Sequence, residues 1–274
     1  MKKIIVLFLI LCVVAGFAAA DDEGIGLSVG LEFRAENASK ANDGDVSTYL
    51  MPMIIYENSF LDGALDLSAE LDYNFGLTKE DDTNPQYLYV DLSVGYNISI
   101  GEKSTLSIIL ENEFDPIIVA PKIEEGNSLI GIFTPAVKFN QSLDIGDLYA
   151  QIGAPINYIQ FYKDADTVIG LDFTLGWNSS FGLGIEAKIC SLLSPSEASG
   201  YTGLDLTVSY EAESIYFEVE TLIPNEIDIE GITITPEFDY SFKNFTFYIK
   251  SEFAGIGTDG DVVISPALGI KYSF

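Results

Sequence analysis

The feature that most constrains this chain is a two-residue alternation of apolar and polar side chains that recurs from residue 25 to residue 274. The stretch 65–77 shows it clearly, because Leu, Ala, Tyr and Phe at the odd positions alternate with Asp, Ser, Glu, Asn and Gly. Successive side chains of a β-strand point to opposite faces, so this pattern predicts strands with one apolar and one polar face. No stretch after residue 20 keeps a helical period.

The alternation divides the chain into strand-length segments. Fourteen segments follow it: 25–34, 49–56, 65–77, 88–100, 106–114, 133–139, 148–158, 169–177, 181–189, 204–210, 215–223, 232–242, 245–253 and 264–274. Short and longer polar connections roughly alternate along the chain. The short ones lie near 101–104, 178–180, 211–214 and 243–244, and the longer ones include 37–47, 78–86 and 115–128. This predicts antiparallel hairpins with short turns at one end of a sheet and longer loops at the other.

The N-terminus has the pattern of a secretory signal peptide. Lys2 and Lys3 precede an apolar run, and three alanines at 18–20 precede acidic residues. A membrane anchor helix is the alternative, but the run is shorter than the about 20 residues that a span needs. Lipoprotein processing at Cys12 would need a small residue in place of Leu11. We therefore expect residues 1–20 to be removed and residues 21–274 to form a single domain.

Composition excludes several classes of function. The formal charge is −29, from 42 acidic against 13 basic residues, which argues against nucleic acid as a partner. The chain has no histidine, the commonest general base and metal ligand, so we propose no catalytic residues and expect no cofactor and no metal. Past the signal only Cys190 remains, so an internal disulfide is excluded.

The apolar face distinguishes a membrane barrel from a β-sandwich, which also alternates. In the fourteen segments this face carries no charged residue, and Tyr and Trp side chains lie toward the segment ends, where a membrane interface favours them. We therefore predict an all-β fold, a transmembrane antiparallel up-and-down β-barrel of about fourteen strands, within a range of about 12 to 16.

The final segment carries a family resemblance. Its alternation runs through Tyr272 to an aromatic last residue, Phe274. This resembles the terminal strand of bacterial outer-membrane β-barrel proteins, porin-like ones included, in which the final Phe is read by the barrel assembly machinery. The resemblance implies location in the outer membrane, with lipid and that machinery as partners and Tyr272 and Phe274 as an assembly signal.

The polar face is then expected to line the lumen, and it is strongly acidic. Its sixteen carboxylates are Glu32, Asp66, Glu70, Asp72, Asp91, Glu111, Glu113, Asp172, Glu186, Asp205, Glu211, Glu218, Glu220, Glu237, Asp239 and Glu252. Its five bases are Arg34, Lys138, Lys188, Lys250 and Lys271. Pairing with five bases cannot neutralise sixteen acids, so the lumen is predicted to attract cations. A lumen locked by salt bridges is the alternative.

Many Gly and Ser residues share this polar face, so the lumen of a barrel of this size is expected to stay open. Four inward tyrosines, Tyr89, Tyr149, Tyr216 and Tyr248, could stack on sugars, but we interpret them as lumen packing. Taken together, these features predict a porin-like channel for passive diffusion of small hydrophilic solutes that prefers cations. The alternative is a non-conducting surface barrel that acts as an adhesin or a structural protein.

Overall fold

The computed structural model describes residues 26–37, 46–77, 86–120, 130–159, 168–192, 200–225, 231–258, 260 and 262–274. The expected signal peptide at residues 1–20 lies outside this part of the chain. Fifteen strands are seen: β1 (Gly26–Asn37), β2 (Val46–Phe60), β3 (Leu65–Gly76), β4 (Gln86–Gly101), β5 (Ser104–Ala120), β6 (Ile130–Leu143), β7 (Gly146–Gly153), β8 (Ile156–Ile159), β9 (Val168–Ser179), β10 (Leu183–Leu192), β11 (Gly200–Ala212), β12 (Ile215–Pro224), β13 (Ile232–Phe242), β14 (Phe245–Ile256) and β15 (Val263–Ser273).

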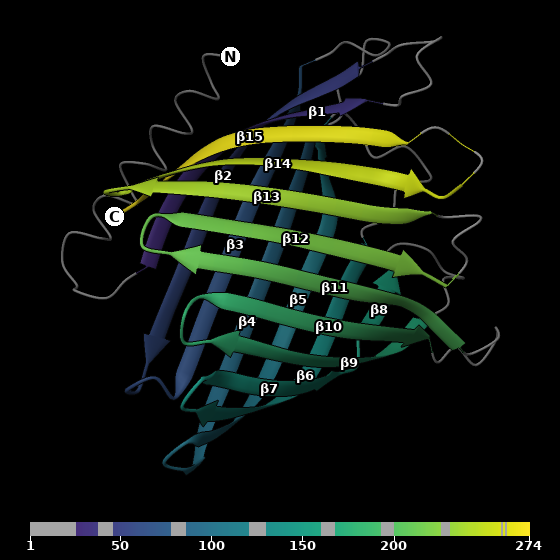
Figure 1. Ribbon diagram of the computed structural model, residues 1–274. Coiled ribbons are helices and arrows are strands. Elements are labelled where there is room, and N and C mark those ends of the chain that lie inside the picture. The colour runs from purple at the N-terminus through teal and green to yellow at the C-terminus, as the bar shows by residue number, and fades with distance from the viewer. Residues whose placement is uncertain are drawn as a thin grey trace.

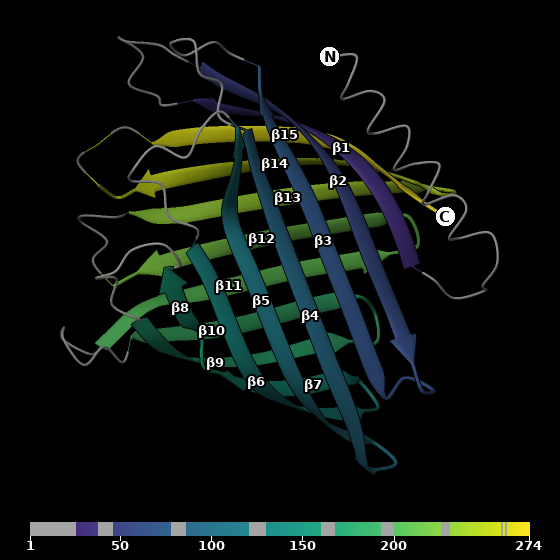
Figure 2. The same cartoon turned by 180° about the vertical axis from the view of Figure 1, so that it is seen from behind.

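The strands close into one antiparallel barrel. Apart from β7 and β8, each strand pairs with its neighbours in the chain, and the ring closes where β1 pairs with β15, for example Glu32 opposite Gly269. Figure 1 shows β9–β15 on the near wall and Figure 2 shows β2–β6 on the opposite wall. Closure leaves no open sheet edge, which is what a β-structure in lipid requires.

The wall contains fourteen strands, because β7 and β8 occupy a single position between β6 and β9. Both pair with β6 on one side and with β9 on the other. Ala154 and Pro155 separate them, and a proline has no N–H to donate to a ladder. The predicted all-β barrel of about fourteen strands is therefore confirmed, and the expected strand 148–158 is interrupted once.

Short turns gather at one end of the barrel. They comprise residues 61–64, 102–103, 144–145, 180–182, 213–214 and 243–244. The first turn uses the left-handed region at Leu61, Asp62 and Gly63, with φ of 55°, 56° and 83°. The chain end lies here as well, because the N–H of Phe274 donates to the carbonyl oxygen of Leu27 at 3.0 Å. The short turns are thus confirmed, whereas most residues of the longer connections lie outside the described part of the chain.

The outside of the barrel is apolar. In β14, Phe247 and Ile249 are 47% and 56% exposed, whereas Tyr248 between them is only 5% exposed because it points inward. The same contrast recurs in β9, where exposed Leu175 and Phe173 flank buried Thr174. Among the described residues, no helix is long and apolar enough to cross a membrane.

Candidate functional site

The interior of the barrel gathers the side chains that the sequence singled out. By the alternation along each strand, the predicted residues lie on the face opposite the exposed apolar side chains: Glu32, Arg34, Asp66, Glu70, Asp72, Asp91, Glu111, Glu113, Asp172, Glu186, Lys188, Asp205, Glu218, Glu220, Glu237, Asp239, Lys250 and Glu252. They do not form one site. They divide into a packed wall, an acidic wall and several local pairs.

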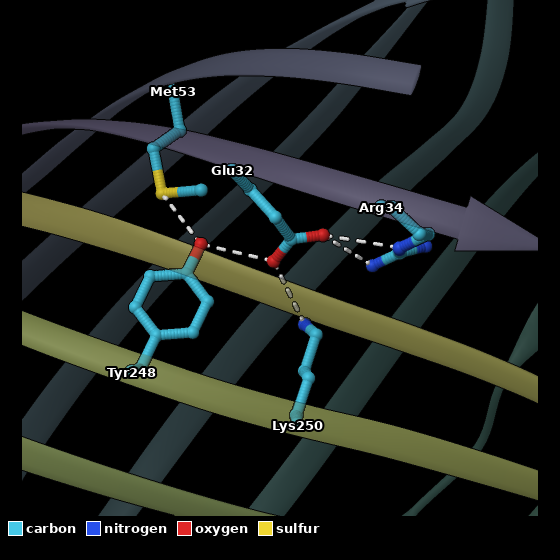
Figure 3. A network of polar contacts seen from close by, with 5 residues as sticks. All are labelled: Glu32, Arg34, Met53, Tyr248 and Lys250. Carbon is cyan, nitrogen blue, oxygen red and sulfur yellow. Dashed lines mark hydrogen bonds and ion pairs between the residues drawn. The ribbon is translucent and has the colours of Figure 1, made fainter. Parts of the chain in front are cut away.

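The packed wall surrounds Glu32, which is only 2% exposed. Its carboxylate accepts a hydrogen bond from Arg34 Nε at 3.0 Å and forms an ion pair with Lys250 Nζ at 3.4 Å. The hydroxyl of Tyr248 donates to Glu32 Oε2 at 2.9 Å, and Met53 packs beside that hydroxyl (Figure 3). A buried carboxylate needs such partners to remain charged, and β1 and β14 supply them here.

The acidic wall lies on β2–β5. The sequences of these four strands contain no Lys or Arg. Glu70 lies directly opposite Asp91, and Asp91 lies directly opposite Glu113, so three acids form one row across β3, β4 and β5. Like charges at opposed positions of neighbouring strands cost stability, so this row works against the stability of the sheet.

Open space adjoins the acidic wall. One cavity has a volume of about 970 Å³ and is lined by residues of β1–β7, among them Glu57, Asp66 and Glu111. A second cavity of about 260 Å³ shares Glu57 and Glu111 with it and is also lined by Glu70, Asp91 and Glu113. The acids of this wall therefore border cavities, whereas Glu32 is buried among its partners.

Other predicted residues form contacts with a few neighbouring side chains. Lys188 forms an ion pair with Asp172 at 3.2 Å between β10 and β9. Asp66 accepts hydrogen bonds from Ser59 Oγ at 2.5 Å and from Asn97 Nδ2 at 2.6 Å.

Two acids accept hydrogen bonds from tyrosines, Glu186 from Tyr149 and Glu218 from Tyr216. Tyr149 and Tyr248 are both nearly buried, so their rings pack in the wall as expected.

The remaining acids have fewer partners. Asp205 and Glu220 lie within hydrogen-bonding reach of each other, as do Glu237 and Asp239. In the part of the chain that the structure describes, one oxygen each of Asp72, Asp205 and Asp239 is buried without a hydrogen-bond partner. Glu252 lies opposite Ser265. Among the described residues, no group of three or more Cys, Asp or Glu side chains is arranged to hold a metal ion.

Sequence reasoning missed some interior residues of β2. Met53 contacts Tyr248, and Glu57 lines the cavity of about 970 Å³, yet the sequence analysis predicts neither to face the lumen. The inward face of this strand alternates weakly, because Met51, Met53 and Ile55 are themselves apolar. Glu57 could have been found from the two-residue period, because it continues the set of positions that contains Met53 and Ile55.

Comparison with known proteins gives a likeness of fold. No model of a known protein family matches the chain, and no curated protein matches it. A structure described as CdiB from Acinetobacter baumannii is similar with a TM-score of 0.53 and 10% identity, over 92% of this chain and 60% of that one. A triple mutant of Rhodopseudomonas blastica porin aligns with a TM-score of 0.46 and 8% identity, over 91% of this chain and 99% of that one.

The architecture defines the class of protein. An even number of antiparallel strands, short turns at one end and an apolar exterior around a polar interior characterise bacterial outer-membrane barrels. This chain has all of these features. Its fold is that of an outer-membrane β-barrel.

Proposed function

We propose that the chain is a channel for passive diffusion of small hydrophilic solutes across the outer membrane, with a preference for cations. The observation that carries the proposal is the cavity of about 970 Å³ beside a wall of acids. It is lined mainly by polar side chains such as Ser93, Asn97 and Gln151, which suit water and hydrated ions rather than an apolar ligand.

Charge supports the preference for cations. Strands β2–β5 contribute Glu57, Asp66, Glu70, Asp91 and Glu111 to the cavity walls and contain no base. Three of the five interior bases, Arg34, Lys250 and Lys271, belong to β1, β14 and β15, and two of these bind Glu32. Lys138 also lines the cavity of about 970 Å³, but the acids that line the two cavities outnumber it, and the resulting negative potential favours cations.

The exterior supports lipid as a partner, because its exposed side chains are apolar along the strands. Assembly machinery is a second proposed partner. Tyr272 and Phe274, whose ring centroids lie 4.9 Å apart in an edge-on arrangement, are proposed as its recognition signal.

Conductance tests the proposal against the alternative of a non-conducting adhesin. The purified protein is reconstituted into a planar lipid bilayer, and single-channel current is recorded at a fixed voltage in KCl. We expect discrete steps of constant size, because a rigid barrel holds a fixed open cross-section. A protein that inserts with a strand-rich circular dichroism spectrum but never conducts would favour the surface-barrel alternative.

A further inference from the structure

The ring of Tyr149 lies flat against the barrel wall because it rests on a glycine. Tyr149 in β7 is the direct register partner of Gly176 in β9. A Cβ atom added to Gly176 would overlap the Cζ, Cε1 and hydroxyl positions of this ring. Only glycine lacks that atom, so Gly176 is what allows the ring to occupy this position.

Two further groups hold the ring. Its hydroxyl donates to Glu186 of β10, which is the register partner of Gly176 on the other side. The ring therefore spans from β7 across β9 to β10. Lys138 Nζ lies 4.1 Å from the ring centroid, a distance at which an ammonium group is attracted to an aromatic face.

Tyr149 lies at the boundary between two interior cavities. One, of about 390 Å³, is also lined by Lys188 and Asp172. The other, of about 340 Å³, is also lined by Ser209 and Glu218. Tyr149 and Glu186 line both. The hydrogen-bonded pair therefore borders both cavities.

A second copy of this arrangement has different surroundings. Tyr248 in β14 lies over Gly269 in β15 and donates to Glu32 in β1, so Tyr, Gly and Glu again occupy three consecutive strands. There the acid is 2% exposed and bound by Arg34 and Lys250. The arrangement at Glu32 is buried within the barrel wall, whereas the arrangement at Glu186 borders two cavities.

We propose that Tyr149 is a size-selecting residue of the channel, and that Gly176 and Glu186 are the positioning residues that hold its ring against the wall. This inference rests on the proposed diffusion function and deepens it. The ring fixes the cross-section between the two cavities. Any side chain at Gly176 displaces the ring from the wall and narrows that passage.

Single-channel conductance and exclusion of uncharged polyethylene glycols of graded size test the proposal. For Tyr149→Ala, which removes the ring, we expect conductance to rise roughly 1.5-fold and larger polymers to enter. For Gly176→Ala we expect lower conductance and a smaller size limit. The double variant should behave like Tyr149→Ala, because the alanine at 176 acts only through the ring. Gly101→Ala is the control, since a Cβ there meets no atom within 4 Å.

The outcomes separate this inference from the proposed function. If the unmodified protein conducts but Tyr149→Ala matches it in conductance and in polymer exclusion, the inference is wrong and the channel stands. If the unmodified protein does not conduct, both fail. Tyr149→Ala creates no steric clash, so it gives the decisive comparison even if Gly176→Ala does not insert.

Discussion

The hydroxyl of Tyr248 donates a hydrogen bond of 2.9 Å to Glu32, although 216 residues separate them in the chain. The bond crosses β15 and joins β14 to β1, the strand at which the barrel closes. Arg34 and Lys250 bind the same carboxylate, so three donors hold one buried acid. This cluster links the first strand to the last hairpin at the seam.

Removal of that hydroxyl should weaken the seam. We expect Tyr248→Phe to lower the free energy of unfolding by about 1.5 to 3 kcal/mol, because a buried charged acceptor loses a donor. Urea unfolding in lipid vesicles, followed by fluorescence of the single tryptophan, Trp177, measures this. Tyr216→Phe is the matched control, because its acceptor, Glu218, lies on its own strand. If both variants lose the same free energy of unfolding, the contact across the seam contributes no more to stability than a contact within one strand.

Gly269 should tolerate no side chain while Tyr248 is present. A Cβ at this position would overlap ring atoms of Tyr248, so we expect Gly269→Ala to destabilise the barrel by about 1 to 3 kcal/mol. Adding Tyr248→Ala should remove most of the extra cost of Gly269→Ala in a double-mutant cycle of unfolding free energies. Strictly additive effects would show that the ring and the glycine act independently.

Phe274 should promote insertion of the barrel into the outer membrane. Its N–H bonds to Leu27 across the seam and its ring contacts Tyr272, so Phe274→Asp places a charge where apolar closure is needed. We expect less protein in the outer-membrane fraction, with export unchanged, as measured by fractionation and immunoblotting. Phe181→Asp is the control, because Phe181 lies exposed in a turn of the same end. Normal insertion of Phe274→Asp would contradict the proposed assembly signal.

The sequence predicted much of the fold, because alternation reports which face each side chain takes. All fourteen wall strands were found, with ends shifted by a few residues. The weakest segment, 49–56, belongs to β2 (Val46–Phe60), whose inward methionines blur the pattern because they are apolar. One of them, Met53, contacts Tyr248. The break at Ala154 and Pro155 was not foreseen, since the outward and inward faces continue on both sides of it.

The arrangement within the interior could not be predicted in the same way. Alternation places Glu32 and Glu70 on one face, but it does not say that one is buried by bases and the other borders a cavity. That difference depends on contacts between strands far apart in the chain, such as Tyr248 with Glu32 and Lys250 with Glu32. Such contacts follow from closure and register, which local pattern does not specify.

The row of acids across β3, β4 and β5 should set ion preference. Replacement of Glu70, Asp91 and Glu113 by Gln, Asn and Gln removes three like charges that border a cavity, so we expect cation preference to fall while the barrel still folds. The control neutralises three acids in the turns, Glu102, Asp144 and Glu213, whose charges are screened by solvent. Reversal potentials and circular dichroism check both variants. A larger change of the reversal potential in the control variant would contradict the assignment of ion preference to this row of acids.

The reversal potential of the unmodified protein under a gradient of KCl across a planar bilayer tests the central claim most directly. We predict a potential of the sign that marks selectivity for K⁺, and we predict that it weakens at high salt as the Debye length falls from about 8 Å toward 3 Å. A potential of the opposite sign, or one that does not change with salt, would contradict an acidic wall that selects the permeating ion.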